Sequence, residues 1–404
     1  MRPFSFVHTA DLHLGYEQYN LDTRCEDFYR AFQEVVEKTI ELKPDLMIIA
    51  GDLFQHARPS NSTLENAITS FRKLKEAGIA VLAVDGSHDA APNVITGTIL
   101  NPLDKAGLIH YLPRHEEACW RNENCYVYGV PNFRTRSKTE ELLPSFYEIK
   151  KPKPNPEFFN IFLFHMALDI PSMVKKHPRI EAEASPGLLP DGFNYYAGGH
   201  IHSPFKIPFR NGVLAYSGCT ETVSYEDSGV EKGFFYVEVD RDGNPEISHI
   251  ELESPRSFII LDEDYSGLKP DKITELAVHS VKKCDEPGVV IIPVLRGTLP
   301  PESTRREIDL ARIRNAAEKA LLVRPILQMR EKGIPEDVIR SIFDGKMQDL
   351  KTKTFEYFLQ FFSQSYPKEE AERNARLALD LIQPLVQGEE EKVKEALEAA
   401  LSEN

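Results

Sequence analysis

Five short segments of this chain carry acidic or imidazole side chains directly after apolar runs. They read Asp11-Leu12-His13, Gly51-Asp52, Gly86-Ser87-His88-Asp89, the single His165, and Gly199-His200-Ile201-His202. The preceding runs, among them residues 4–10, 45–50 and 159–165, are short and apolar, as buried strands are. Loops at the carboxyl ends of strands in a layered α/β domain meet at one edge of the sheet. We therefore expect these side chains to converge on one site.

The chemistry of this set is that of a metal centre. In an extended segment, residues two apart point to the same side, so Asp11 with His13 and His200 with His202 can each present two ligands. Mixed imidazole and carboxylate ligands suit Mn, Fe or Zn better than Ca or Mg. The set is too large for one four-coordinate zinc. It suffices for two ions about 3.5–4 Å apart, which clamp the attacking and leaving oxygens of phosphoester hydrolysis.

Each segment taken alone has an ordinary structural explanation. A single Asp-x-His or Gly-Asp pair is usually a turn or a helix cap, and a lone His165 is more often a hydrogen-bonded core residue than a ligand. The Gly-His-Ile-His segment is the most specific of the five. The metal interpretation is favoured because all five segments occur together, each at the end of an apolar run.

The elements that must position these residues begin as an alternation of strands and helices. Strands are predicted at 4–10, 45–50 and 79–84, and helices at 22–42 and 62–77, the second with a Ser62-x-x-Glu65 cap and an end at Gly78. Further strands are predicted at 125–130, 159–165, 194–198, 213–216, 234–239 and 246–252. Few helices are predicted between 155 and 255. The pattern favours two packed sheets flanked by helices over a single parallel sheet.

The composition changes after about residue 255. A strand at 258–262, a helix at 271–283 and a strand at 288–295 indicate a small α+β module. From about 305 the chain is predicted to be almost wholly helical, with apolar faces in 335–363 and 368–386 that include Val338, Ile339, Ile342 and Phe343. We therefore predict three parts, at residues 1–254, 255–330 and 331–404.

Bulk properties restrict the classes of protein. The net charge of −15 over 404 residues argues against nucleic-acid binding over the whole surface, so any such binding must come from a local site. No apolar run approaches the roughly 18 residues of a membrane helix, and the first residues lack signal-peptide features. The five cysteines are scattered and odd in number, which indicates reduced thiols. We expect a cytoplasmic protein without membrane association.

The order D-x-H, G-D, G-x-H-D, H, G-H-x-H resembles the calcineurin-like binuclear metallophosphoesterases. The stretches HTADLHLGYEQYN, IAGDLFQHARPS and GGHIH are similar to the archaeal double-strand-break repair nucleases of the meiotic-recombination (Mre-eleven) type and their bacterial relative SbcD. The resemblance is specific over 6–93 and 159–219 and looser over 220–330. It implies a four-layer α/β fold, in which a metallophosphoesterase β-sandwich is flanked by helices. A small α+β capping domain that binds DNA and a C-terminal helical segment would follow.

The resemblance also implies roles for the site residues. One Mn²⁺ would be held by Asp11, His13, Asp52 and His202, and a second by Asp52, Ser87, His165 and His200, with Asp52 bridging. His88 would stabilise or protonate the scissile phosphate and the leaving oxygen. A water activated by the two cations would be the nucleophile. We expect Asp89 to be an acceptor that orients His88, in preference to a direct ligand.

Two departures from the family pattern bear on activity. Relatives have Asn where this chain has Ser87, a shorter neutral ligand, so we expect a more weakly bound second ion and reduced hydrolysis. Relatives commonly have His where this chain has Gln55, and here a histidine follows at His56. Candidate DNA-binding residues are His56 and Arg58 after the G-D loop, and Arg134 and Arg136 further along the chain.

The implied function is Mn-dependent DNA cleavage in double-strand-break repair, as a 3′–5′ exonuclease on duplex DNA and an endonuclease on single strands. The implied partners are DNA, an SMC-like coiled-coil ATPase (Rad-fifty type) bound through the C-terminal helices, and a second copy of the chain bound through helices of the first 110 residues. Two alternatives stay open. One is a phosphodiesterase for a small molecule, and the other is a DNA-repair scaffold whose hydrolysis is feeble because of Ser87.

Overall fold

The structure is a computed structural model that describes residues 1–91, 97–176, 181–301, 303–331, 347–363, 366–387, 392–394 and 397. These residues form two compact units. The first comprises Met1–Asp262, Ala277–Val294 and Ala311–Ile326, and the second comprises Glu263–Leu276, Leu295–Leu310 and the chain from Leu327 onwards. The predicted boundaries at 254 and 330 stay predictions. None of the described helices is long and apolar enough to cross a membrane.

The first unit contains a six-stranded sheet of order β12-β11-β1-β2-β3-β4. Its strands are β1 (Phe4–Thr9), β2 (Leu46–Ala50), β3 (Ala80–Val84), β4 (His110–Tyr111), β11 (Gly233–Val239) and β12 (Pro245–Glu251). Strands β1 to β4 are parallel, and β11 runs antiparallel to β1. The loops that follow β1, β2 and β3 therefore leave the sheet at the same edge.

A second six-stranded sheet has the order β5-β6-β7-β8-β10-β9. Its strands are β5 (Cys119–Arg121), β6 (Cys125–Gly129), β7 (Phe159–His165), β8 (Tyr195–Gly199), β9 (Phe205–Phe209) and β10 (Gly212–Tyr216). Strands β6, β7, β8 and β10 are parallel. Strand β7 ends at His165 and β8 ends at Gly199, immediately before His200, so this sheet also presents its histidines at the ends of strands.

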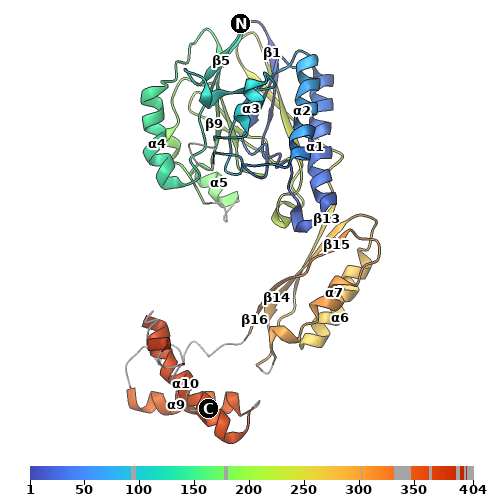
Figure 1. The fold of residues 1–404 in the computed structure, drawn as a ribbon, viewed down its shortest axis with the longest axis vertical. Coiled ribbons are helices and arrows are strands. Elements are labelled where there is room, and N and C mark those ends of the chain that lie inside the picture. The colour runs from blue at the N-terminus through green and yellow to red at the C-terminus, as the bar shows by residue number, and fades with distance from the viewer. Residues whose placement is uncertain are drawn as a thin grey trace. The chain divides into compact units, whose positions relative to one another are not determined.

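The two sheets pack face to face and are covered by helices on their outer faces (Figure 1). Alternate residues of each strand point to opposite faces. Phe6 and Ile48 lie between the sheets with Tyr195, whereas their neighbours in the strands pack under α1 (Asp22–Leu42) and α2 (Asn61–Glu76). Helix α4 (Arg136–Ile149) covers the second sheet through Leu143. The predicted four-layer α/β sandwich is confirmed.

Shorter helical elements complete the sandwich. They are α3 (Leu100–Lys105), α5 (Pro171–Lys176), and the 3₁₀ turns η1 (Gln18–Asn20), η2 (Leu112–Arg114), η3 (Pro186–Leu188) and η4 (Tyr225–Asp227). Helix α2 begins one residue earlier than predicted. Its cap is Ser60, whose hydroxyl accepts a hydrogen bond from the Thr63 amide, because Ser60 is extended while Ser62 is already helical. The predicted cap at Ser62 is therefore wrong.

The chain from 258 to 330 forms a small mixed module. Its strands β13 (Phe258–Asp264), β14 (Val290–Thr298), β15 (Leu322–Val323) and β16 (Ile326–Arg330) form one sheet, in which β16 also pairs with β14. Its helices are α6 (Pro270–Lys283), α7 (Leu310–Arg314) and the turn η5 (Arg305–Glu307). The prediction of an almost wholly helical chain from 305 is wrong up to residue 330. Leu322 and Val323 are drawn into strand pairing with the buried Val290 and Ile291.

Two C-terminal helices are present, as predicted. They are α9 (Met347–Phe362) and α10 (Lys368–Gln387), which pack side by side (Figure 1). Within this hairpin Ala371 and Ala375 are buried, and Arg376 lies 6.0 Å from the centre of the Phe355 ring. The predicted helical segment at 335–346, with Val338, Ile339, Ile342 and Phe343, lies outside the described residues.

A buried cluster of charges fastens α1 to later parts of the first unit. The fully buried Arg24 donates to Asp27 Oδ2 at 2.6 Å and pairs with Glu221 at 3.2 Å. Arg256 donates to Asp27 Oδ1 at 2.6 Å and to the carbonyl of Gly288 at 2.6 Å. Arg30 also contacts Asp27 Oδ1, so this one carboxylate binds three guanidinium groups and joins α1 to Arg256, which in turn contacts Gly288.

Replacing Asp27 by Asn should destabilise the protein strongly, because Arg24 and Arg256 would lose their shared counter-charge. Breaking one partner of a buried pair costs about 3–5 kcal/mol, so we expect a loss of that size in the free energy of unfolding, measured by urea denaturation. The exposed Glu41→Gln on the same helix is the control, with an expected change within about 0.5 kcal/mol.

The stabilisation by Asp27 should also depend on pH. Burial alone would raise the pKa of Asp27, but hydrogen bonds and charge from Arg256 and Arg24 hold it below its usual 3.8. The contribution is therefore present above about pH 4 and lost as the pH falls through the folded-state pKa. The difference between parent and Asp27→Asn should shrink in acid, and a difference that grew as the pH fell would contradict this account.

Candidate metal centre

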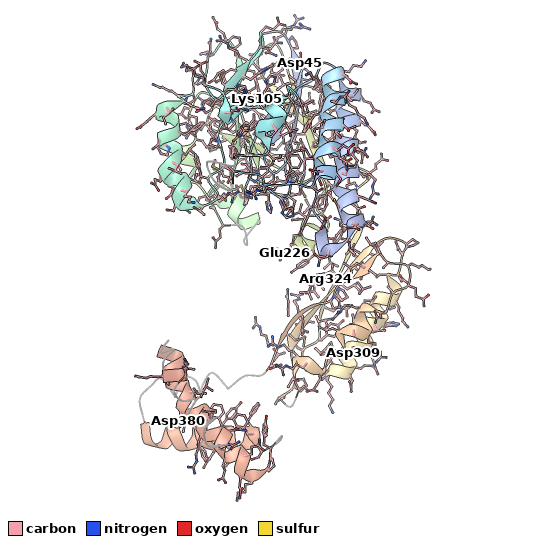
Figure 2. The ribbon with its side chains drawn as sticks, viewed as in Figure 1. Asp45, Lys105, Glu226, Asp309, Arg324 and Asp380 are labelled. Carbon is pink, nitrogen blue, oxygen red and sulfur yellow. The ribbon has the colours of Figure 1, made fainter. Side chains whose placement is uncertain are left out.

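The loops after β1, β2, β3, β7 and β8 gather at one end of the sandwich. Asp45, which precedes β2, lies at the opposite end of this unit from Glu226 (Figure 2). Potential ligand atoms lie within 4.8 Å of one another in three groups that share members: Asp11, His13 and His202; Asp11, Asp52 and His165; and His13, Asp52 and His88. A further group, Cys219 and Asp227 with His202, adjoins them. Because Asp11, His13 and Asp52 are shared between groups, the three groups form one site.

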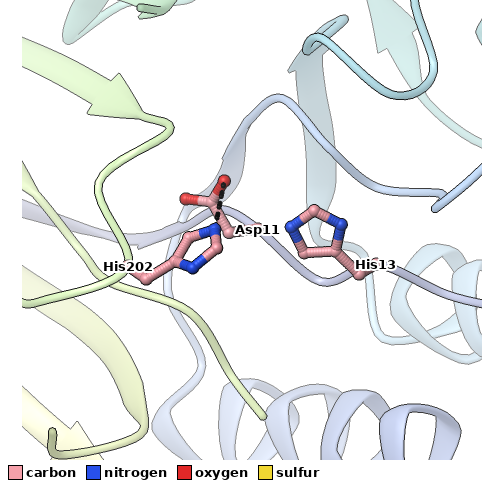
Figure 3. Close-up of side chains that lie close together, drawn as sticks. All are labelled: Asp11, His13 and His202. Carbon is pink, nitrogen blue, oxygen red and sulfur yellow. Dashed lines mark ion pairs between the residues drawn. The ribbon is translucent and has the colours of Figure 1, made fainter. Parts of the chain in front are cut away.

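Asp11 and His13 come from the loop after β1, and His202 comes from the loop after β8 (Figure 3). The distance between His202 Nε2 and Asp11 Oδ1 is 4.0 Å. His200 joins the cluster through its backbone amide, which donates to Asp11 Oδ2 at 3.0 Å. The ring centres of His200 and His165 are 5.3 Å apart. Residues far apart in the sequence therefore meet as predicted.

The backbone at the site is held in an unusual conformation. Asp11, His13, Asp52 and His200 have φ values of 54°, 47°, 49° and 89°, in the left-handed region that non-glycine residues seldom adopt. Each such residue costs about 1–3 kcal/mol, and such residues cluster at functional sites. The surroundings enforce these conformations. The amides of Leu12 and His13 both donate to the Asp52 carbonyl, at 2.9 and 3.0 Å.

Two glycines allow the loops to approach this closely. A side chain at Gly86 would lie 2.1 Å from Asp52 Oδ1, and one at Gly199 would lie 1.9 Å from the carbonyl oxygen of Ala50. Neither position can accept even a methyl group without moving the site. The glycines of the G-S-H-D and G-H-I-H segments are thus part of the geometry that brings the site loops together.

The histidines are aimed by acceptors outside the cluster. His165 Nδ1 donates to the carbonyl of Ala50 at 2.8 Å, which leaves Nε2 facing Asp52 Oδ2 at 3.1 Å. His13 Nδ1 donates to Gln55 Oε1 at 2.9 Å, and its Nε2 is 4.0 Å from Asp52 Oδ2.

His202 is aimed in the same way. Its Nδ1 donates to Asp227 Oδ2 at 3.0 Å, and its Nε2 faces Asp11. The Nε2 atom of His13 is buried and has no hydrogen-bond partner among the described residues, and that of His165 is buried and faces Asp52. A ligating histidine commonly has its far nitrogen held by a carboxylate or carbonyl, with the near nitrogen left for the metal. The residues present therefore fit a divalent metal.

The electrostatics of the cluster also suit cations. Burial alone would raise the pKa of Asp52, but the charge and hydrogen bond of His165 hold it well below its usual range. Burial raises the pKa of Asp11 to about 6. Burial would lower the pKa of His165, yet Asp52 raises it to about 10, so a proton occupies this side chain where a metal would displace it. Burial lowers the pKa of His13 and His200 to about 3, which leaves them as neutral ligands.

Ser87 and His88 lie at the open side of the cluster. The Ser87 hydroxyl donates to Asp52 Oδ2 at 3.3 Å, and the His88 amide donates to Asp52 Oδ1 at 2.8 Å. The His88 ring is exposed, and its Nδ1 donates to the carbonyl of Gln55 at 3.1 Å. His88 is therefore held beside the cluster, with its ring exposed.

Asp89 does not play the part predicted for it. Its oxygens accept hydrogen bonds from the amides of Leu53 at 2.8 Å, Phe54 at 3.2 Å and Gly86 at 2.7 Å. It fastens the loops after β2 and β3 to each other, while the Gln55 carbonyl orients His88. The prediction that Asp89 orients the His88 ring is wrong, because the buried backbone amides of the two loops are the nearer donors to its oxygens.

Three residues at the site were not found from the sequence. Gln55 was noted there only as a departure from the family, yet it holds both His13 and His88. Asp227 lies 25 residues beyond His202, with no spacing signal. Glu183 places Oε2 3.9 Å from His200 Nε2, and burial raises the pKa of its carboxyl group.

The predicted DNA-binding residues fall into two pairs. His56 and Arg58 are exposed in the loop that follows Asp52. Arg134 donates to the carbonyl of Ala90 at 2.7 Å, and Arg136 forms ion pairs with Glu140 at 2.9 Å and Asp169 at 3.6 Å. The second pair is thus engaged within the chain, and contact of any of these residues with DNA stays a prediction.

Comparison with known proteins agrees with this geometry. Residues 4–204 match the calcineurin-like phosphoesterase family. The DNA double-strand break repair protein Mre11 of Methanocaldococcus jannaschii is 32% identical over 305 residues, 72% of this chain and 76% of that protein. The Archaeoglobus fulgidus Mre11 is 30% identical over 77% of this chain and 72% of its own length. A dimetal phosphatase from Danio rerio aligns with a TM-score of only 0.36 at 11% identity, over 62% of this chain and 99% of that one.

Fold and site together define a calcineurin-like phosphoesterase, a hydrolytic enzyme with a metal centre. The chain belongs to the family of the DNA double-strand break repair protein Mre11. It is accordingly a DNA double-strand-break repair phosphoesterase.

Removing the charge that holds His202 should weaken metal binding. Asp227→Asn keeps the size of the side chain but removes the anion that His202 Nδ1 contacts at 3.0 Å. Loss of such an orienting partner costs about 10–100-fold in metal affinity, and we expect a decrease of that order for one Mn²⁺ by titration calorimetry. Asp242→Asn in the exposed β11–β12 turn is the matched control. Unchanged affinity in Asp227→Asn would contradict the orienting role.

Proposed function

We propose that this protein is a Mn²⁺-dependent DNA nuclease, an exonuclease on duplex ends and an endonuclease on single strands. The observation that supports it best is the single cluster of two buried carboxylates and aimed imidazoles. Asp11, His13, Asp52 and His202 would hold one ion. Asp52, Ser87, His165 and His200 would hold the other. Imidazole with carboxylate suits Mn²⁺, and no cysteine takes part.

The chain's own residues account for the steps around the phosphodiester. Two bound cations would lower the pKa of a water and neutralise charge on the phosphate. Asp52, 2% exposed, belongs to two of the groups of potential ligand atoms, so it would serve both ions. His88 is exposed beside them, within reach of a docked phosphate, where it would donate a proton to the leaving oxygen. The Gln55 carbonyl keeps the ring turned for this role.

DNA must approach a protein of net charge −15. The metal ions would supply positive charge where the phosphate docks, and the exposed Arg58 and His56 follow directly on the Asp52 loop. These two side chains are the best candidates for backbone contacts near the scissile bond. Arg134 and Arg136 would contribute only after their contacts within the chain are exchanged for phosphate.

We further propose that the α9–α10 hairpin binds the coiled coil of an SMC-like ATPase. Phe361 is 56% exposed and Tyr366 is 43% exposed on this hairpin, while small alanines fill its interior. An exposed aromatic face on paired helices is suited to a partner helix. A homodimer through the N-terminal helices is also proposed. The apolar residues of α2, such as Phe71 and Leu74, are buried in the chain's own core, so they would not form its interface.

Replacing His88 by Ala tests the catalytic assignment. General acid–base groups contribute about 10²–10⁴-fold, and we expect hydrolysis of labelled duplex and single-stranded DNA with Mn²⁺ to fall by that order while ion binding stays at the parent level. The exposed His279→Ala is the control. If ion binding fell as well, His88 would be a ligand. Cleavage of a generic phosphodiester but of neither DNA would overturn the nuclease proposal in favour of a small-molecule phosphodiesterase.

Replacing Ser87 tests whether this residue limits the enzyme. An Asn side chain extends a carbonyl oxygen farther than the Ser87 hydroxyl, so Ser87→Asn should tighten the second Mn²⁺ and raise the rate of DNA cleavage. Ser87→Ala, which removes the hydroxyl, should bind that ion more weakly than the parent. An inert parent with an active Ser87→Asn variant would favour the scaffold interpretation. Equal binding of both ions at low Mn²⁺ in all three proteins would contradict a limiting role for Ser87.

A further inference from the structure

The second ion has the less complete set of ligands. Asp52 would be shared with the first ion, and His165 and His200, whose ring centres are 5.3 Å apart, would supply imidazoles. The remaining group is the Ser87 hydroxyl, which donates its proton to Asp52 in this structure. A neutral hydroxyl is a weak ligand for a hard divalent cation, which prefers carboxylate or carbonyl oxygen. The environment of His200 is therefore the place to look for another oxygen.

Glu183 lies at that place. Its Oε2 is 3.9 Å from His200 Nε2, and its side chain is 14% exposed. Ligand atoms that are each about 2.0–2.2 Å from one ion lie about 3–4 Å from each other, so the pair has the separation of two groups on a common cation. A bound cation would draw both side chains to itself.

The backbone holds Glu183 beside the segment that follows His165. The Glu183 amide donates to the Ala167 carbonyl at 2.8 Å, and the Ala167 amide donates back to Glu183 Oε2 at 3.2 Å. The next residue continues the pairing, because the Asp169 amide donates to the Ala184 carbonyl at 2.9 Å. Glu183 Oε2 thus accepts a backbone hydrogen bond and also faces His200, and a carboxylate held in this way is an oriented candidate ligand.

The charge balance of the site also favours Glu183 as a ligand. Two divalent cations carry four positive charges, and of the ligands named so far only Asp11 and Asp52 are anionic, with Asp227 behind His202. Glu183 would add a negative charge on the side of His165 and His200, where none of these ligands but Asp52 supplies one. Buried or partly buried charges are stable when they are balanced by neighbours. Glu183 would therefore balance part of the charge of the second cation.

We propose that Glu183 is a ligand of the second metal ion and supplies the anionic oxygen that Ser87 cannot. This assignment rests on the proposed two-ion centre. It predicts that Glu183 and Ser87 act on the same ion, so a stronger oxygen ligand at position 87 should offset a weaker one at position 183.

The test is Mn²⁺ titration calorimetry on the full chain, with electron paramagnetic resonance to detect coupled ions. Glu183→Gln keeps an acceptor for the Ala167 amide but removes the anion, and should weaken one of the two ions by roughly tenfold or more and reduce the coupled signal. The exposed Glu181→Gln, two residues away, should match the parent. Ser87→Asn combined with Glu183→Gln should recover most of the lost affinity, which also shows that the chain folds with Glu183→Gln in place.

The outcomes separate this assignment from the function on which it rests. Two ions bound by Glu183→Gln with parent affinity would overturn the role of Glu183 alone. A loss that Ser87→Asn fails to restore would overturn direct ligation and leave Glu183 as a residue that positions His200. A parent that binds fewer than two ions would overturn the binuclear centre itself.

Discussion

The interaction between Asp52 and the groups around it is the constraint on which the rest of this structure depends. Its carbonyl accepts the Leu12 and His13 amides, its Oδ1 accepts the His88 amide, and its Oδ2 lies 3.1 Å from His165 Nε2. One residue thereby fixes the loops after β1 and β3 and the end of β7 in the other sheet. A carboxylate that is 2% exposed is tolerable only when it is paired in this way, so loops that move would leave an unbalanced buried charge.

The apolar core decides how precisely that pairing is made. Phe6, Ile48 and Leu82 of the first sheet pack between the sheets against Ile161 and Tyr195 of the second. Because interiors are close-packed, the separation of the sheets is set by these side chains and is not adjustable at the rim. The distance from Asp52 to His165 therefore follows from the core. The strained backbone of Asp11, His13, Asp52 and His200 persists because both the core and the buried hydrogen bonds oppose its relaxation.

The parts of the fold that could be predicted are those that depend on the local sequence, on apolar runs and the residues directly after them. Apolar runs marked the strands that carry the site, and ligands directly after them marked the metal centre, because a strand's end places its loop at the sheet edge. Gln55, Asp227 and Glu183 carry no such mark, since their roles arise from contacts across the chain. The strands at 322–330 were missed for the same reason. Short segments there take their structure from pairing with β14.

The acceptors behind the three aimed histidines differ in charge, and this difference makes the site asymmetric. Ala50 and Gln55 offer neutral oxygens to His165 and His13, whereas Asp227 offers an anion to His202. Burial alone would lower the pKa of His202, yet the hydrogen bond and charge of Asp227 hold it above its usual value. The ligand group that contains His202 is thus supported by an anion that accepts the hydrogen bond of His202 Nδ1. The group built on His165 and His200 has only neutral support behind His165, so its hold on a cation depends on how many anionic oxygens face it.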